Sequence, residues 1–401
     1  MALLTPKNED ELQAAIEQAC ADGDPLEIIG AGSKRSLGRP VDADNQLDLT
    51  NLKGVIDYEP AELVLTARPG TPLLEIEALL ADADQAFAFE PADYSELFGS
   101  DHGGTLGGMI ACNLSGPRRI KAGAARDHLL GFRGVTGHGQ SFKSGGKVVK
   151  NVTGYDLSKL VTGSMGTLAA LSEVSVKTLP KPEITRTLML RDLDDHQALA
   201  ALTHGMTSAH EVSGAAHLPA GVPARLGLGN AALTALRLQG PGPSVDARFA
   251  SLAGELRCDD KLESKSSSTL WQGIRDAAPL IGASDQAVWR LSVPPNAGPD
   301  VVARLRSSLD MKYFYDWAGG LIWLSVADRG DASAGVIRGA IAGVEARGGG
   351  HATLIRAPEA VRAEVPVFHP QPAPLAALTK RVKDSFDPKR VLNPGRMYRG
   401  V

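Results

Sequence analysis

The hydrophobic and polar positions at the start of the chain follow the period of a helix. Leu12, Ile16 and Cys20 recur at i, i+4 and i+8 and so share one helical face. Asn8 precedes this pattern and can accept a hydrogen bond as an N-cap, with a glutamate three residues later as its capping-box partner. The pattern therefore predicts an amphipathic helix over residues 5–21.

Short apolar runs between turn residues dominate the next part of the chain. These runs predict strands at 26–29, 47–49, 54–58, 63–67 and 87–91. Between the last two, Leu73, Ile76, Leu79 and Leu80 recur at helical spacing and predict a second helix. Helices and strands do not alternate regularly, so this order is typical of the α+β class rather than of a doubly wound sheet.

The middle of the chain is predicted to hold a hairpin and a short helix. The expected segments are a polar loop at 120–126, hairpin strands at 129–136 and 140–143, a helix at 156–161 and a mostly β segment at 168–179. Pro180-Lys181-Pro182 follows, and we interpret it as a hinge between domains.

Strand and helix patterns alternate in the second half. Strands are predicted at 184–190, 232–239, 288–293, 312–317, 321–326 and 353–356. Helices are predicted at 196–207, 244–258, 268–276, 299–309, 332–347 and 375–386. This alternation, with an antiparallel hairpin inside it, predicts a ferredoxin-like α+β domain. We place the domain boundaries at 1–181, 182–370 and 371–401.

Composition limits the classes of function. With 401 residues, the chain is long enough for two or three domains of about 100–200 residues each. Its formal net charge is −4, which argues against a broad nucleic-acid footprint. No apolar run is long enough to span a membrane, and the N-terminus lacks the pattern of a secretory signal. Three widely spaced cysteines indicate neither a disulfide framework nor a metal cluster, so we expect a cytoplasmic protein.

Glycine-rich stretches are the strongest candidates for chemistry. They occupy residues 30–38, 100–116 and 163–173. Glycine lets backbone approach a ligand closely, and successive main-chain N–H groups can bind a phosphate. Residues 30–38 fail as a dinucleotide-binding fingerprint, because Arg35 stands where the third glycine is needed. This makes a nicotinamide dehydrogenase a weak hypothesis. We interpret the stretches as a cofactor cradle built mostly from main chain; the alternative is a set of tight turns that join strands.

Several motifs coincide with one known family. They are Ile28-Ile29-Gly30-Ala31-Gly32-Ser33, Thr105-Leu106-Gly107-Gly108, Arg126-Asp127, Gly163-Ser164-Met165-Gly166-Thr167-Leu168 and the tail Phe386-Asp387-Pro388-Lys389-Arg390-Val391-Leu392-Asn393-Pro394-Gly395-Arg396. In these motifs the chain resembles flavoproteins of the vanillyl-alcohol oxidase or p-cresol methylhydroxylase type, over the first 180 residues and the tail. The resemblance implies a two-part FAD-binding domain, with the ferredoxin-like domain as its cap.

The resemblance also implies which residues bind FAD. The expected set is Gly30, Ala31, Gly32, Ser33, Lys34, Gly70, Pro91, Thr105, Gly107, Gly108, Asn113, Ser115, Gly116, Arg126, Gly163, Gly166 and Leu171. Family members that bind flavin covalently carry a histidine just after the pyrophosphate glycines. Here that position reads Ser33-Lys34-Arg35, so the resemblance implies non-covalent FAD.

Within the family, the second half resembles the FAD-binding E subunits of bacterial glycolate oxidases. The similar segments include 288–294 and 315–324. The resemblance implies a complex with a larger flavin subunit and an iron–sulfur subunit, a small 2-hydroxy acid such as glycolate as substrate, and association with a membrane only through these partners. The chain would pass electrons from the acid to the iron–sulfur partner or another acceptor.

The candidate cap lacks one expected feature. Related 2-hydroxy acid dehydrogenases hold a divalent ion with paired histidines and a glutamate. Here the candidates are scattered, and each is expected to be an ordinary polar residue: His196, His204, His210, His217, His351 and His369. We expect no metal site. An alternative function is therefore a flavin-binding structural subunit, with catalysis in a paralogous partner.

A substrate carboxylate is best held by a bidentate guanidinium. Arg290, on a predicted cap strand beside Trp289, is our candidate, with Arg275 and Arg356 as reserves. The alternative for each arginine is an ion pair or a surface charge. Aromatic residues of the 312–326 hairpin are expected either to cover the flavin or to fill the core: Tyr313, Tyr315, Trp317 and Trp323.

Overall fold

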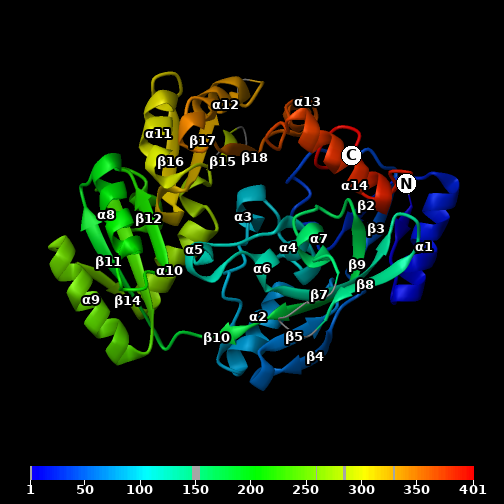
Figure 1. Ribbon diagram of the computed structural model, residues 1–401, viewed down its shortest axis with the longest axis horizontal. Helices are drawn as coiled ribbons and strands as arrows, with labels where there is room; N and C mark the ends of the chain where they lie inside the picture. Colours follow the sequence, from blue (N-terminus) through cyan, green and yellow to red (C-terminus); the bar gives the residue numbers. More distant parts are fainter. Residues whose placement is uncertain (1, 147–153, 259, 283–285, 328–329) are drawn as a thin grey trace. The chain divides into compact units, whose positions relative to one another are not determined.

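The computed structural model describes residues 2–146, 154–258, 260–282, 286–327 and 330–401. The chain forms two compact units (Figure 1). Unit 1 contains residues 1–114, 123–181 and 366–401, and unit 2 contains residues 115–122 and 182–365. The tail thus returns to unit 1 after the chain has built unit 2, and the short segment 115–122 packs with unit 2.

Unit 1 contains two principal sheets. A parallel sheet has the order β1-β3-β2, with β1 at Leu3–Leu4, β2 at Leu26–Ile29 and β3 at Asn45–Asp48. An antiparallel sheet has the order β4-β5-β9-β7-β8, with the bounds Val55–Glu59, Val64–Ala67, Ala169–Lys177, Leu129–Thr136 and Ser141–Gly145. A small pair joins β6 (Gln85–Ala86) to β10 (Leu179–Pro180).

Helix α1 (Glu9–Asp22) covers the parallel sheet through an apolar face. The amide N–H of Glu11 donates to Asn8 Oδ1 at 2.8 Å, which confirms Asn8 as the N-cap. Leu12 and Ile16 are fully buried in a core that also takes in Leu392 from the tail. The tail is therefore part of the hydrophobic core of unit 1.

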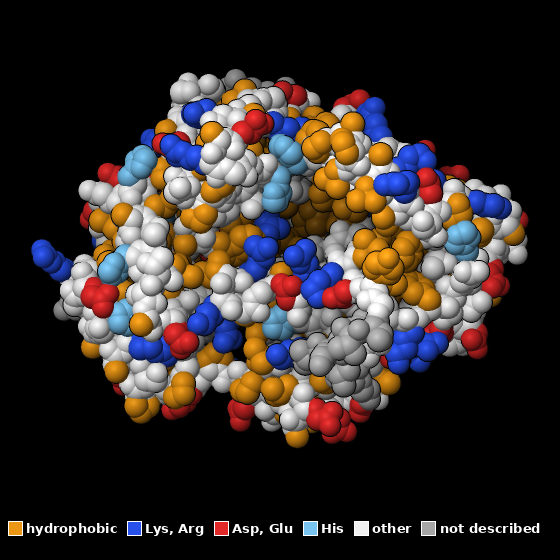
Figure 2. All heavy atoms as spheres, in the orientation of Figure 1, with side chains coloured by type: hydrophobic (Ala, Val, Ile, Leu, Met, Phe, Trp, Pro, Cys, Tyr) orange, Lys and Arg blue, Asp and Glu red, His pale blue; other side chains and the backbone are white. Residues whose placement is uncertain are grey.

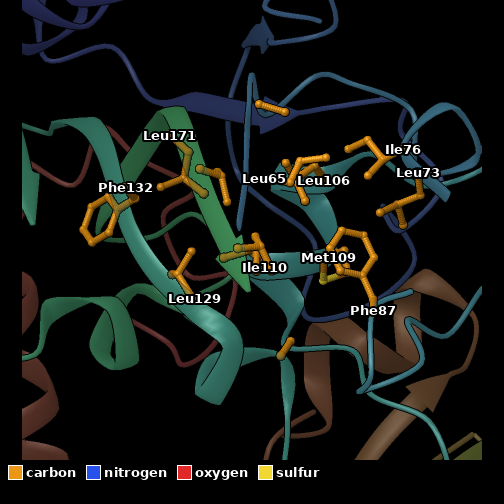
Figure 3. Packing of buried hydrophobic residues seen from close by; sticks show 14 of the residues in the cluster. Leu65, Leu73, Ile76, Phe87, Leu106, Met109, Ile110, Leu129, Phe132 and Leu171 are labelled. Carbon is orange, nitrogen blue, oxygen red and sulfur yellow. The ribbon is translucent and has the colours of Figure 1, made fainter. Parts of the chain in front are cut away.

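The second core of unit 1 surrounds helix α4 (Leu106–Cys112). Figure 3 shows the side chains of α4, α2 (Leu73–Asp82) and the antiparallel sheet packed together. Leu106, Met109 and Ile110 are fully buried there. Burying each such side chain contributes about 1.5–3 kcal/mol relative to exposure. This packing fixes the position of the helix within unit 1.

The remaining helices of unit 1 are short, apart from the tail helix. They are α3 (Ser95–Phe98), α6 (Ala125–His128), α7 (Leu157–Val161) and α14 (Ala373–Phe386). Helices α5 (Arg119–Ala122) and α13 (Glu359–Glu364) lie in unit 2.

Unit 2 consists of two ferredoxin-like modules that share one eight-stranded antiparallel sheet. The sheet order is β14-β11-β13-β12-β16-β17-β15-β18. The first module contains β11 (Ile184–Arg191), α8 (Asp195–Thr207), β12 (Gly214–Leu218), β13 (Leu233–Gly240), α9 (Gly242–Leu256) and β14 (Lys261–Glu263). The second contains β15 (Gln286–Ser292), α11 (Gly298–Arg306), β16 (Met311–Asp316), β17 (Leu321–Ala327), α12 (Ala334–Ala342) and β18 (His351–Arg356). Helix α10 (Ser264–Arg275) stands between them in the sequence.

Both modules have the β-α-β-β-α-β order and place their first strand between the third and the fourth. They join where β12 pairs with β16, at His217 and Tyr315. The predicted ferredoxin-like domain is thus confirmed in kind, but it occurs twice. Strand β12 was not predicted, because its sequence Gly-Ala-Ala-His-Leu lacks β-branched residues.

Two segments have a different secondary structure from the one that we predicted. Residues 87–91, predicted as a strand, form turns and irregular backbone after the two-residue strand β6. Residues 120–126, predicted as a loop, fall largely within the one-turn helices α5 and α6. The glycine stretch 100–116 also contains α4, which begins where Thr105 caps it.

On the face drawn in Figure 2, Asp and Glu side chains lie among the Lys and Arg side chains. This mixture agrees with the formal net charge of −4. No helix among the described residues is long and apolar enough to cross a membrane.

Candidate functional site

Unit 1 contains a groove that is lined by all three glycine-rich stretches. Its empty volume is about 790 Å³, which includes solvent space at its open side. Its walls are the loop after β2, the start of α4, the 165–171 segment and two tail residues, Asn393 and Arg396. Ten of the predicted FAD-binding residues line it: Gly30, Ala31, Gly32, Ser33, Lys34, Thr105, Gly107, Gly108, Gly166 and Leu171. Residues distant in sequence therefore converge on one concavity.

The loop at 30–34 provides main-chain donors. Within the described residues, the N–H groups of Ala31, Gly32, Ser33 and Lys34 have no internal acceptor. Gly32 has φ +73°, a conformation that favours glycine, and a Cβ there would meet only Arg35 Cδ, at 3.7 Å. No helix follows the loop, as its sequence predicted. Such a run of available donors suits an anionic ligand.

The start of α4 forms a different kind of wall. Gly107 N donates to Pro69 O at 2.8 Å, and Gly108 N donates to Thr105 Oγ1 at 3.3 Å. These amides are already hydrogen-bonded within the protein, so this glycine segment contributes close packing rather than donors. A Cβ on Gly107 would lie 2.6 Å from Pro69 Cβ, which explains why glycine is needed there.

Two tail residues complete the groove. Asn393 Oδ1 accepts from Ile28 N at 2.7 Å, and Asn393 Nδ2 donates to Met165 O at 2.7 Å. Arg396 donates to the carbonyl oxygens of Lys34 and Arg35 at 3.0 and 3.1 Å. We had not predicted either residue as part of the site, although both lie in the quoted tail motif.

Positive charge predominates along the groove. Lys34, Arg35 and Arg396 line it, whereas Glu27 is the acidic residue among its lining residues and forms an ion pair with Arg35. Burial raises the pKa of the Cys112 thiol, an effect that Lys34 and Arg396 partly offset. The groove therefore offers main-chain donors and cations to an anion, and it holds a protonated thiol at neutral pH.

Comparison with known proteins places the chain in a family. It is 36% identical to the glycolate oxidase subunit GlcE of Escherichia coli over 392 residues, which is 97% of this chain and 98% of that protein. The chain belongs to the GlcE family. Residues 1–145 match the family described as FAD binding domain. The glycolate oxidase subunit GlcD of Bacillus subtilis is 31% identical over 47% of this chain and 39% of that protein.

Solved structures support the same fold. A 4-ethylphenol oxidase from Gulosibacter chungangensis aligns with a TM-score of 0.70 at 14% identity, over 99% of this chain and 89% of that one. A p-cresol methylhydroxylase aligns with a TM-score of 0.68 at 12% identity, over 98% and 88%. The predicted α+β fold of the p-cresol methylhydroxylase type is thus confirmed for this GlcE-family chain. The chain is an FAD-dependent oxidoreductase, with FAD as its cofactor.

The groove of the GlcE-family chain fits FAD on chemical grounds. A dinucleotide carries a pyrophosphate, and the loop at 30–34 combines available N–H donors with the ammonium group of Lys34. Ala111, Met165 and Leu171 add apolar surface for the rings. We therefore assign the loop to the pyrophosphate as a proposal that the experiments below test.

Other predicted FAD-binding residues lie outside the groove lining. In unit 1, the amide N–H of Arg126 donates to Asn113 Oδ1 at 3.2 Å, and a Cβ on Gly163 would lie 3.3 Å from Asn113 Cβ. These three residues thus form one cluster at the C-terminal end of α4. Gly70 donates its N–H to Leu52 O at 2.7 Å and packs against the backbone of residues 49–52, just after β3. The remaining three are Pro91, in unit 1, and Ser115 and Gly116, which belong to unit 2.

Arg290, the candidate for substrate binding, lies on β15 in unit 2. Its guanidinium stands 5.0 Å from the ring centroid of Trp317, and Arg119 stands 4.2 Å from the same ring. The reserve candidate Arg275 makes a bidentate ion pair with Asp276, at 2.8 and 2.7 Å. Among the described residues, no carboxylate pairs with Arg290, whose guanidinium lies against the Trp317 ring. Arg290 therefore remains the better candidate of the two.

The hairpin aromatics lie inside unit 2. The hydroxyls of Tyr313 and Tyr315 both donate to Asp195 Oδ2 at 2.9 Å, and burial raises the pKa of both phenols. Trp323 is buried and stacks on Phe314 at a centroid distance of 6.4 Å. These contacts give the aromatics a packing role in this unit.

The described residues contain no group of three or more His, Cys, Asp or Glu side chains placed to hold a metal ion. His204 and His210, which we had listed among scattered histidines, nevertheless come together. Each places Nε2 2.7 Å from a different oxygen of Glu255, because His210 lies beyond the end of α8. The two histidines lower the pKa of Glu255 and form a polar cluster with it.

Proposed function

We propose that this chain is the FAD-binding subunit of a complex that oxidises a 2-hydroxy acid, with glycolate as the substrate. The observation that carries the proposal is the loop at 30–34, whose available N–H donors line a cationic groove. The 36% identity to the E. coli glycolate oxidase subunit, over nearly the whole of both chains, supports the choice of acid. FAD binds non-covalently, since the loop carries Ser33 and Lys34 where a histidine would be attached to flavin.

The cofactor supplies the redox chemistry when it is bound, because its flavin ring accepts the two electrons released by the acid. The protein's part is to bind and orient. The loop at 30–34 holds the pyrophosphate, and the 165–171 segment lines the groove beside it. Arg290 holds the carboxylate of the acid through two parallel hydrogen bonds. An iron–sulfur subunit of the same complex would serve as the electron acceptor.

A second function is favoured by one observation. Related 2-hydroxy acid dehydrogenases bind a metal ion with paired histidines and a glutamate, whereas His204 and His210 meet on Glu255 in the described part of unit 2 without forming a group placed to hold a metal ion. A chain without this set would bind FAD as a structural subunit, while a larger paralogous flavin subunit oxidises the acid. The two proposals share the groove and differ only in where the acid is oxidised.

The test begins with the purified chain. We expect a flavin absorbance spectrum and release of free FAD on denaturation, which shows non-covalent binding. A chain that takes up no FAD would overturn both proposals. Glycolate is then added without oxygen. Bleaching of the flavin in the isolated chain supports oxidation in this subunit, whereas bleaching that needs the larger flavin subunit supports the structural role.

A further inference from the structure

The tail contains an ion pair that is completely buried. Lys383, on α14, and Asp387 both have 0% exposed side chains, and Lys383 Nζ lies 2.6 Å from Asp387 Oδ2. The other two ammonium donors are also used: Nζ lies 2.7 Å from Thr167 O and 2.9 Å from Leu392 O. All three N–H donors of the lysine therefore have acceptors, and burial lowers its pKa without leaving a donor unpaired.

Asp387 closes the turn that leads toward the groove. Its carboxylate accepts from Val391 N at 2.9 Å and from Leu392 N at 2.8 Å. The turn then pairs with β2, because Leu26 N donates to Val391 O at 2.7 Å and Asn393 N donates to Leu26 O at 3.0 Å. The ion pair thus fixes the backbone immediately before Asn393.

From this turn, two contacts reach the groove walls. Asn393 has φ +43° and links Ile28, just before the loop at 30–34, to Met165 in the wall beside it. Arg396 holds the carbonyl oxygens of Lys34 and Arg35. Lys383 itself holds Thr167 O, two residues beyond Met165. The ion pair is therefore connected to the donor loop and to the wall beside it through hydrogen bonds of 2.6–3.1 Å.

Stability alone does not account for such a pair. Removing two charges from water costs several kcal/mol per ion, and well-packed apolar residues of similar volume often give equal or greater stability. The same helix carries an ordinary Lys–Asp pair with the same i,i+4 spacing, Lys380 and Asp384, at 2.8 Å and largely exposed. What distinguishes the buried pair is its connection to the groove.

We propose that Lys383 and Asp387 are positioning residues for FAD: through Asn393 and Arg396, they hold the loop at 30–34 and the 165–167 segment at the spacing that the cofactor requires. This inference rests on the proposed function only in taking the groove as the FAD site. It adds a positioning role for residues that neither the glycine motifs nor the resemblance assigned.

The test compares three variants of the full chain. Asp387→Asn keeps an acceptor oxygen but removes the charge, and Asn393→Ala removes both wall contacts. Lys380→Met breaks the exposed pair on the same helix and serves as the matched control. For each variant, the FAD dissociation constant, the visible circular dichroism of bound flavin and the unfolding of the FAD-free protein are measured. FAD affinity is expressed per folded molecule.

We expect Asp387→Asn and Asn393→Ala to bind FAD at least about tenfold more weakly, which is about 1.4 kcal/mol. Their flavin circular dichroism should also change, since the ring environment is altered, whereas Lys380→Met should match the wild type in both. Wild-type affinity and dichroism in folded Asn393→Ala would overturn the proposal, even if Asp387→Asn fails to fold. Failure of the proposed function looks different, because the wild-type chain itself would then bind no FAD.

Discussion

Two of the glycine-rich stretches approach each other closely at Gly30, and a single methyl group there tests the geometry of the groove. A Cβ on Gly30 would lie 2.5 Å from Thr105 Oγ1 and 3.3 Å from Thr105 Cγ2. The Gly30→Ala variant must therefore move the Thr105 side chain or the loop. Thr105 is not free to move without loss, because its hydroxyl caps α4 by accepting from Gly108 N.

The magnitude follows from these contacts. Overpacking by a methyl group typically costs about 1–3 kcal/mol, so we expect Gly30→Ala to destabilise unit 1 by that amount. Thr105→Ala should cost about 1 kcal/mol for the lost helix cap. In the double variant, the nearest atom of residue 105 is its Cβ, at 3.5 Å, an ordinary contact distance. The double variant should therefore cost about as much as Thr105→Ala alone, a coupling of about 1–3 kcal/mol.

The assay is a double-mutant cycle on denaturant unfolding. Because the chain has two compact units, the relevant transition is the one whose midpoint rises when FAD is added. Gly103→Ala is the matched control, since a Cβ there would meet nothing within 4 Å. If the costs of Gly30→Ala and Thr105→Ala simply add in the double variant, the two residues are not in contact and the geometry of the groove described above is wrong.

Three further predictions concern charge, reactivity and substrate. The Arg133 guanidinium lowers the pKa of Glu9 from 4.5 to about 2, so the carboxylate stabilises the fold above about pH 4.5 and loses this contribution as the pH falls toward 2. Glu9→Gln should cost about 1 kcal/mol at pH 7, after allowance for the solvent around the pair, and almost nothing near pH 2; an equal cost in denaturant unfolding at both pH values would contradict this. Cys112 lines the groove, so bound FAD should slow the alkylation of Cys112 and leave the alkylation of Cys20 and Cys258 unchanged. Peptide mapping measures all three rates, and equal protection of the three cysteines would argue against this site. Arg290→Lys should raise the KM for glycolate by about tenfold or more in the assembled complex, because a lysine cannot bind a carboxylate through two parallel hydrogen bonds. An unchanged KM would show that Arg290 does not bind the substrate.

Local sequence patterns predicted much of the fold. The helix capped by Asn8 and most strands of both units occur where periodicity placed them. The spacing of apolar residues marks the buried face of each element, and that face can be recognised within the element's own sequence. Helix α4 was missed since its Leu-Gly-Gly start suggests a turn, and tertiary packing of Met109 and Ile110 overrides that weak helix propensity. The repeat of the ferredoxin-like module was missed because β12 is rich in alanine and glycine.

The site was predicted to the extent that glycine motifs mark it. The loop at 30–34 and the start of α4 lie on one groove, and their glycines were visible in the sequence. The roles of Asn393 and Arg396 were not visible, because each depends on hydrogen bonds to residues about 360 positions earlier. A local sequence pattern cannot reveal a contact between residues so far apart in the chain, even where a family motif marks one of the two segments.

The return of the tail also sets an order of events during biosynthesis. A ribosome produces Ile28 365 residues before the Asn393 side chain that accepts its amide proton. A nascent chain therefore exposes the donor loop long before Asn393 and Arg396 are added, and unit 2 is synthesised in between. If the tail positions the groove as we propose, a chain truncated before residue 393 should bind FAD more weakly than the full chain.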